Sequence, residues 1–117
     1  DGLTRRILRS KNVALFAPKL ILEEFWSHLT ELEEKSDVAK PEIISLASCL
    51  SDLIVFLEEE EYRHFLEEAI SLSPDVDDTP YFAVALKLGC GIWSNDRKLG
   101  SQQRITIWRT SQLSTFL

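Results

Sequence analysis

Two short runs of uninterrupted apolar residues constrain the fold more than any other feature of the sequence. They are Val-Ala-Leu-Phe-Ala at residues 13–17 and Leu-Ile-Val-Phe-Leu at residues 53–57. A strand with one wet face alternates polar and apolar residues, whereas a parallel strand covered on both faces is apolar throughout. The two runs therefore predict buried parallel strands.

Helical patterns separate and follow these runs. Apolar residues recur at helical spacing from Pro18 to about residue 35 and from Pro41 to residue 50. Further helices are predicted near residues 2–10, 62–70, 80–88 and from 111, and further strands at 92–94 and 105–108. The last helix should bury Leu113 and Phe116. This alternation predicts an α/β fold with a mostly parallel sheet flanked by helices.

Length and composition predict one ordinary globular domain, residues 1–117. Of its 117 residues, 44% are hydrophobic and 27% are charged, which is enough for a single core. No apolar run approaches the roughly 20 residues that cross a bilayer, and no signal peptide opens the chain. We therefore expect no membrane contact and a cytoplasmic location. Cys49 and Cys90 lack metal-ligand spacing and are predicted to be reduced core residues.

Residues 75–96 carry the strongest local signals. They read as an acidic loop, a helix opened by Pro80 with Thr79 as its N-cap, a stop at Gly89, a short strand, and a Ser-Asn-Asp turn ending at Asp96. Pro80 disfavours the α conformation at Thr79, so the helix is not expected to begin earlier. Helix starts and strand ends gather on one edge of a parallel sheet. The carboxylates of Asp78 and Asp96 could therefore face each other across a cleft.

Ordinary structural roles also account for the acidic residues taken singly. Asp78 could cap its helix, and Asp96 could form a turn. Glu23 and Glu24 flank the apolar stripe of the helix that follows Pro18. Periodicity does not choose between these two glutamates, and both could be surface residues.

The formal net charge of -6 argues against a general nucleic-acid coat. The basic residues are nevertheless uneven, because five of them precede the first acidic cluster: Arg5, Arg6, Arg9, Lys11 and Lys19. They could contact phosphates or form a solvated helix face.

Three stretches resemble PIN-domain ribonucleases. They are Ala17-Pro18 followed by Glu23-Glu24-Phe25, then Asp77-Asp78-Thr-Pro-Tyr-Phe through Gly89, then Ile92-Trp-Ser-Asn-Asp96. The resemblance covers nearly the whole chain. It implies an endoribonuclease that hydrolyses RNA phosphodiester bonds with Mg²⁺ or Mn²⁺, often the toxin of a toxin–antitoxin pair.

The resemblance also assigns roles to residues. Glu24, Asp78 and Asp96 match the catalytic acids that hold the metal, Ser94 matches a supporting hydroxyl residue, and Asp77 is a neighbour that assists. Lys98 stands where many members carry a further acid. The candidates for phosphate contact are Arg5, Arg6, Arg9, Arg97 and Lys98. Crowded carboxylates favour a hard cation, and that cation rather than the net charge would attract RNA.

One departure from the family concerns its first strand. The family opens with a central strand ending in an Asp-Thr-Asn-like motif, whose first Asp is the leading metal ligand. This chain contains no such strand, and Asp1 is not predicted to replace that ligand. The domain is thus expected to be an N-terminally incomplete PIN domain with exposed strand edges. We expect it to be destabilised or to fill the gap by pairing with another chain.

Several functions remain open at this point. The expected partners of a nuclease are RNA, an antitoxin protein and a second copy of the chain in a homodimer or higher oligomer. The alternative is a PIN-fold module that binds a partner or dimerises without cleaving. A receiver-like α/β domain fits less well, because the acids do not follow a first strand and no late strand ends in lysine.

Overall fold

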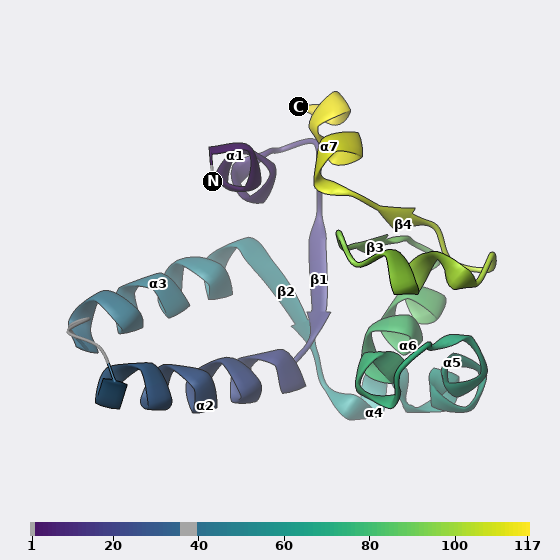
Figure 1. The fold of residues 1–117 in the computed structure, drawn as a ribbon, viewed down its shortest axis with the longest axis horizontal. Coiled ribbons are helices and arrows are strands. Elements are labelled where there is room, and N and C mark those ends of the chain that lie inside the picture. Colours follow the sequence, from purple (N-terminus) through teal and green to yellow (C-terminus); the bar gives the residue numbers. More distant parts are fainter. Residues whose placement is uncertain (1, 36–39) are drawn as a thin grey trace.

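In the part of the chain that the structure describes, four short strands lie in two parallel pairs. β1 (Leu15–Pro18) pairs with β2 (Ile54–Leu57), and β3 (Ile92–Trp93) pairs with β4 (Ile107–Trp108). Each pair is a separate two-stranded sheet, with no ladder between the pairs in the described part of the chain. Figure 1 shows β2 on one side of β1, and β3 with β4 on the other. The predicted α/β fold with parallel strands is confirmed, and its sheet is divided in two.

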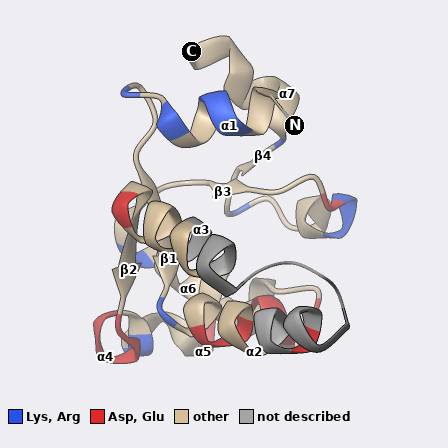
Figure 2. Ribbon diagram, turned by 90° about the vertical axis from the view of Figure 1, so that its left-hand side faces the viewer, with Lys and Arg blue, Asp and Glu red and all other residues tan. Residues whose placement is uncertain are grey.

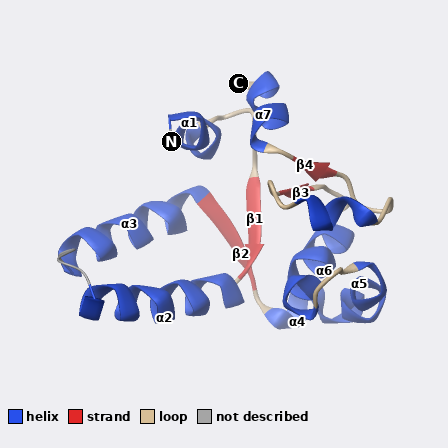
Figure 3. Ribbon diagram, in the orientation of Figure 1, coloured by secondary structure: helices blue, strands red, loops and turns tan. Residues whose placement is uncertain are grey.

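Helices make up most of the protein (Figure 3). The computed structural model describes residues 2–35 and 40–117. The α-helices are α1 (Gly2–Arg9), α2 (Leu20–Lys35), α3 (Lys40–Leu53), α4 (Glu59–Tyr62), α5 (Leu66–Leu72), α6 (Thr79–Leu88) and α7 (Thr110–Leu113). The 3-10 segments are η1 (Arg63–Phe65), η2 (Val76–Asp78), η3 (Arg97–Ser101) and η4 (Ser114–Phe116). α2 and α3 extend to one side of β1 and β2, and α4 to α6 lie on the other side (Figure 1).

The central helix of the core is α6. Phe82 and Ala83 are completely buried, and Val84 and Ala85 are nearly so. They pack in one cluster with Leu57 of β2 and with residues of α4, α5 and η3. Because alanine side chains are small, the backbone of α6 can approach its neighbours closely. The core therefore fixes the position of α6, and with it the acidic residues at its N-terminal end.

Both ends of α6 follow from local chemistry. Gly89 adopts the left-handed conformation, φ 64°, at the C-cap, and the Cys90 N–H donates to the Ala85 carbonyl at 3.1 Å. Glycine takes this conformation without a steric penalty, so the predicted stop at Gly89 is confirmed. The predicted start was wrong by one residue. Thr79 is helical, φ -52° and ψ -45°, because η2 leads directly into α6 and the Thr79 N–H already donates to the Val76 carbonyl.

Three expectations about burial were wrong. Cys49 and Cys90 are both exposed free thiols and not core residues. Leu113 is buried as expected, but Phe116 is 48% exposed. Its ring forms a T-shaped pair with Trp108, with ring centroids 5.5 Å apart. Local apolar surroundings in sequence do not reveal which side of a short element the core covers.

The described residues include no helix of the length and apolar character required to cross a membrane.

Candidate functional site

Asp78 lies where η2 passes into α6 and stands in a field of negative charge. Burial raises the pKa of Asp78, and the carboxylates of Asp75, Asp96 and Asp77 raise it further, whereas the Lys98 ammonium group lowers it. Like charges have this effect because each disfavours the ionised form of its neighbour. The structure thus brings Asp96 near Asp78 from a distant part of the chain. The side chain of Asp78 makes no capping hydrogen bond with α6.

Asp96 forms the turn that begins η3. Its Oδ1 accepts a hydrogen bond from the Lys98 N–H at 3.0 Å, and its own N–H donates to Ser94 Oγ at 3.0 Å. The ordinary role of an aspartate after a strand is therefore present here. Ser94 contacts the backbone of Asp96, so its hydroxyl helps to fix where the Asp96 side chain begins.

The same turn is tied to α7 by residues to which the sequence analysis gave no role. Asn95 Oδ1 accepts a hydrogen bond from the Thr110 N–H at 3.0 Å. Thr110 Oγ1 in turn accepts one from the Trp93 indole N–H at 3.0 Å. Asn95 stands between two polar turn residues, which was the only sequence signal for this contact.

The structure distinguishes Glu24 from Glu23. Burial raises the pKa of Tyr81, and the charges of Glu24 and Asp78 raise it further. Burial also raises the pKa of Tyr62, with Glu23 among the carboxylates that add to this effect. Glu24 therefore shares a neighbour with Asp78, whereas Glu23 acts on Tyr62, whose own charge acts in turn on Tyr81. Tyr81 had no assigned role, although it lies one turn of helix beyond Asp78.

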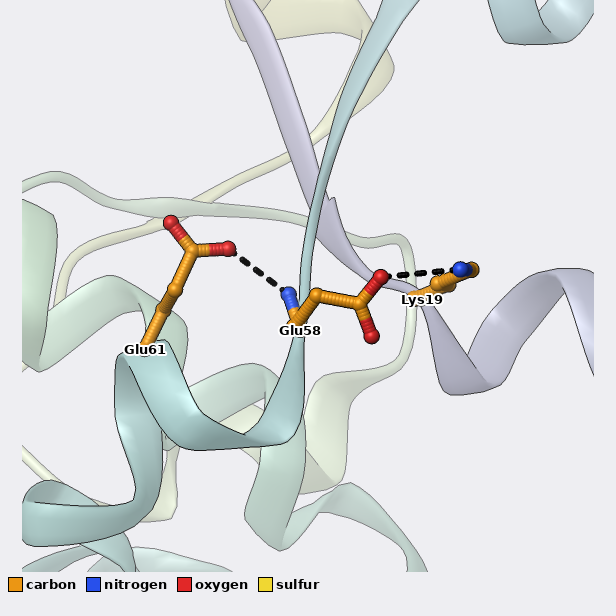
Figure 4. A network of polar contacts seen from close by, with 3 residues as sticks. All are labelled: Lys19, Glu58 and Glu61. Carbon is orange, nitrogen blue, oxygen red and sulfur yellow. Dashed lines mark hydrogen bonds and ion pairs between the residues drawn. The ribbon is translucent and has the colours of Figure 1, made fainter.

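An exposed polar network joins the ends of β1 and β2 (Figure 4). Lys19 Nζ pairs with Glu58 Oε1 at 2.8 Å, and the Glu58 N–H donates to Glu61 Oε2 at 2.8 Å. The Lys19 N–H also donates to the Leu57 carbonyl at 2.8 Å. Because both side chains of the Lys19–Glu58 pair are exposed, the pair should contribute little to stability.

The basic candidates fall into two groups. Arg97 and Lys98 belong to η3 and directly follow Asp96, whereas Arg5, Arg6 and Arg9 lie on α1. Figure 2 shows α1 beside the two termini, away from α2, α4 and α5, which carry much of the acidic surface. Only the η3 pair therefore adjoins the carboxylates of the candidate site.

Acidic residues at a helix start and at the end of a parallel strand form a pattern shared with a known family. A family model described as PIN domain matches residues 1–117. The chain belongs to the PIN-domain family. No curated protein and no solved structure matched it. Membership indicates a nuclease-type function in general terms.

PIN domains generally use divalent metal ions. The question for this chain is therefore whether the side chains of its candidate acids suit such an ion. Glu24, Asp78 and Asp96 offer only carboxylate oxygens, the donors that Mg²⁺ and Mn²⁺ prefer. The mutual repulsion at Asp78 also suits a cation. Among the side chains that the structure describes, however, no group of three His, Cys, Asp or Glu residues is placed to hold a metal ion. The donor chemistry fits, and the assignment of these residues as ligands stays a prediction.

One buried polar atom adjoins this site in the chain. Thr79 is 5% exposed, and its Oγ1 has no hydrogen-bond partner among the described residues. A buried hydroxyl without a partner is uncommon because its desolvation is uncompensated. Thr79 immediately follows Asp78, so this unpartnered hydroxyl lies in the first turn of α6, next in the chain to the candidate carboxylate.

Proposed function

We propose that this PIN domain is a metal-dependent endoribonuclease whose catalytic acids are Glu24, Asp78 and Asp96. The observation that supports it best is that the charge of Asp96 acts on Asp78, although a helix and a strand separate the two residues in the sequence. Glu24 approaches the same region through Tyr81. Two neighbouring carboxylates repel each other and so destabilise the fold, and such pairs are typical of functional sites.

In this proposal Asp78 and Asp96 hold Mg²⁺ or Mn²⁺, with Glu24 as the third oxygen donor. The bound cation supplies a Lewis acid for a phosphate oxygen and lowers the pKa of a water molecule. α6 keeps Asp78 in place because its next turn is anchored in the core by Phe82. The hydrogen bonds of the Asp96 turn restrict its backbone, and Asp77 lies beside Asp78 as an assisting carboxylate.

Two basic side chains would orient the RNA backbone at this site. Arg97 and Lys98 follow Asp96 directly, and the charge of Lys98 already acts on Asp78. Positive charge beside the carboxylates gives a phosphate group a favourable position despite the net charge of -6. Arg5, Arg6 and Arg9 on α1 would contact only a longer stretch of RNA.

The test is cleavage of single-stranded RNA with Mg²⁺ or Mn²⁺ by the intact protein and by Asp96→Asn. Asp52→Asn, on the exposed surface of α3, is the matched control. Activity should fall in Asp96→Asn by more than the roughly 10- to 100-fold that loss of an outer metal partner costs. Equal residual activity in Asp96→Asn and the unchanged protein would indicate a contaminating nuclease.

A second readout separates metal binding from catalysis. Titration with Mn²⁺, followed by calorimetry, should show weaker binding to Asp78→Asn and Asp96→Asn than to Asp52→Asn. Glu24→Gln should weaken binding more than Glu23→Gln, because Glu24 and Asp78 both act on Tyr81, whereas Glu23 acts on Tyr62. Equal effects of the two glutamine variants would contradict the assignment of Glu24.

The proposal extends to a cytoplasmic toxin controlled by an antitoxin, on the strength of the motif resemblance. Expression in a bacterial host should then arrest growth, and Asp96→Asn should relieve the arrest. If the host grows normally while the expressed protein cleaves RNA, the toxin role is wrong and the nuclease proposal still stands.

A non-catalytic module is the second candidate, and a specific observation favours it. The described residues contain two separate sheets and no complete three-ligand metal group. In that case the protein would bind a partner or dimerise, and neither RNA cleavage nor Mn²⁺ binding would depend on Asp96. Light scattering would show whether it forms the homodimer or higher oligomer expected from the sequence.

A further inference from the structure

The turn that carries Asp96 is anchored on both sides, although Asp96 itself is exposed. On the C-terminal side, Leu99 of η3 is buried in the core cluster that also contains residues of α6. On the N-terminal side, the turn follows β3, which has only two residues and pairs with the two residues of β4. A strand pair this short is weak by itself, so further contacts must fix the turn.

The three residues that precede this aspartate all bind one short segment, which runs from the end of β4 to the start of α7. The Trp93 indole N–H donates to Thr110 Oγ1 at 3.0 Å. The Ser94 N–H donates to the Trp108 carbonyl at 2.9 Å. Asn95 Oδ1 accepts a hydrogen bond from the Thr110 N–H at 3.0 Å. We call these three hydrogen bonds the strand-end clamp.

Thr110 takes part in two bonds of the clamp, as an acceptor through its hydroxyl and as a donor through its N–H. It is the first residue of α7, and the N–H groups in the first turn of a helix have no partner within the helix. Asn95 therefore caps α7 from a distant part of the chain. α7 is itself fixed, because Leu113 is buried and the helix packs against α1. The clamp thus joins the end of β3 to a helix that is held in place.

The clamp acts on Asp96 through the backbone. Asp96 directly follows Asn95, and its N–H donates to the hydroxyl of the clamp residue Ser94. The charge of Asp96 acts on Asp78, so a shift of the turn would change how the two carboxylates stand to each other. A binding site works when the surrounding residues hold its donor atoms to within about 0.5 Å. The clamp supplies such a restraint.

We propose that Asn95 and Thr110 are positioning residues, which hold the Asp96 carboxylate where it can share a divalent cation with Asp78. This inference rests on the proposed function, in which Asp96 is a metal ligand. Asn95 and Thr110 act through the backbone of the turn and are not ligands themselves. If their role were only to complete the N-terminus of α7, their loss would affect stability and leave the affinity for the metal unchanged.

Gln112 is the matched control for that purely structural role. Its Oε1 accepts a hydrogen bond from the Arg109 N–H at 2.8 Å, so it also supplies an amide oxygen to the start of α7. Gln112 and Asn95 are both exposed. Asn95→Ala and Gln112→Ala should therefore lower the urea midpoint by similar amounts. A difference between them in metal affinity then reports the position of the turn and not the stability of the fold.

The experiment is calorimetric titration of the whole protein with Mn²⁺. Asn95→Ala should weaken binding by about 10- to 100-fold, the usual loss when a residue that orients a metal ligand is removed. Gln112→Ala should change binding by less than about twofold. Thr110→Val should weaken binding at least about tenfold, whereas Thr110→Ser, which keeps the acceptor for Trp93, should bind like the unchanged protein. Equal affinities within either pair of variants would overturn the proposal.

Amide hydrogen exchange without metal separates a failure of this proposal from a failure of the proposed function. The N–H groups of Asp96 and Lys98 are both hydrogen-bonded within the turn. Their exchange should be at least about tenfold faster in Asn95→Ala than in Gln112→Ala. Unchanged exchange in Asn95→Ala would refute the positioning role, even if Asp96 binds the metal. If exchange is faster but Asp96→Asn binds Mn²⁺ as the unchanged protein does, the assignment of Asp96 as a ligand is wrong and the clamp on the turn is supported.

Discussion

Replacement of Phe82 by alanine tests whether α6 is anchored as the structure indicates. Phe82 is 0% exposed and packs in the cluster that joins α6 to β2, α4, α5 and η3. A buried phenylalanine removes about 200 Å² from water, which at about 25 cal/mol per Å² corresponds to about 5 kcal/mol. Alanine retains about 1 kcal/mol of this. Phe82→Ala should therefore lower the free energy of unfolding by about 4 kcal/mol, within the range for buried aromatic residues.

The assay is urea unfolding followed by circular dichroism, with Ile70→Ala as the control. Ile70 lies on α5 beside the same core but is 62% exposed. Its replacement should cost less than about 1 kcal/mol, because most of the side chain is already in water. With a slope of about 2 kcal/mol per molar urea, the midpoint should fall by about 2 M for Phe82→Ala and by less than about 0.5 M for the control.

A milder substitution protects the test against complete unfolding. Domains of this kind have unfolding free energies of about 5–15 kcal/mol, so Phe82→Ala could leave little folded protein at the low end. Phe82→Leu keeps most of the apolar volume and should cost about 1–2 kcal/mol. A cost for Phe82→Ala no larger than that for Ile70→Ala would show that α6 does not occupy the core position described.

Three further predictions concern the site and the turns beside it. Because the pKa of Asp78 is raised in the folded state, protonated Asp78 favours folding fully below its ordinary pKa of 3.8, and this contribution is lost as pH rises through the pKa of the folded state. The urea midpoint of Asp78→Asn should therefore rise relative to that of the unchanged protein as pH increases from about 3.5 to about 7. Gly91→Ala should destabilise by about 1–3 kcal/mol, because its Cβ would lie 2.5 Å from Trp108 Nε1, whereas Gly100→Ala meets no atom within 4 Å and should have little effect. Gly89→Ala should lower the unfolding free energy by about 1 kcal/mol, because Gly89 has φ 64° with open space around it. The argument for Asp78 would be contradicted by the same difference in urea midpoint at about pH 3.5 and at about pH 7. The argument for Gly91 would be contradicted if Gly91→Ala and Gly100→Ala lowered the unfolding free energy equally, and that for Gly89 if Gly89→Ala did not lower it.

The sequence by itself determined the order and type of most elements. Continuous apolar runs specified β1 and β2 to within about two residues, and Gly89 specified the end of α6. These features are local, because strand and helix differ in hydrophobic period and glycine takes a left-handed conformation freely. That Asp96 acts electrostatically on Asp78 was also predictable from local order, since parallel topology places helix starts and strand ends on one edge.

Only the tertiary structure decided which surfaces meet. It placed Glu24 rather than Glu23 near Tyr81, exposed Cys49 and Cys90, and separated the described strands into two pairs. Periodicity identifies one face of a helix, but two neighbouring residues at the border of that face have the same periodic signal. Strand pairing depends on contacts between segments that are far apart in the sequence. The amino-acid pattern of a strand therefore does not indicate whether its second edge pairs with another strand.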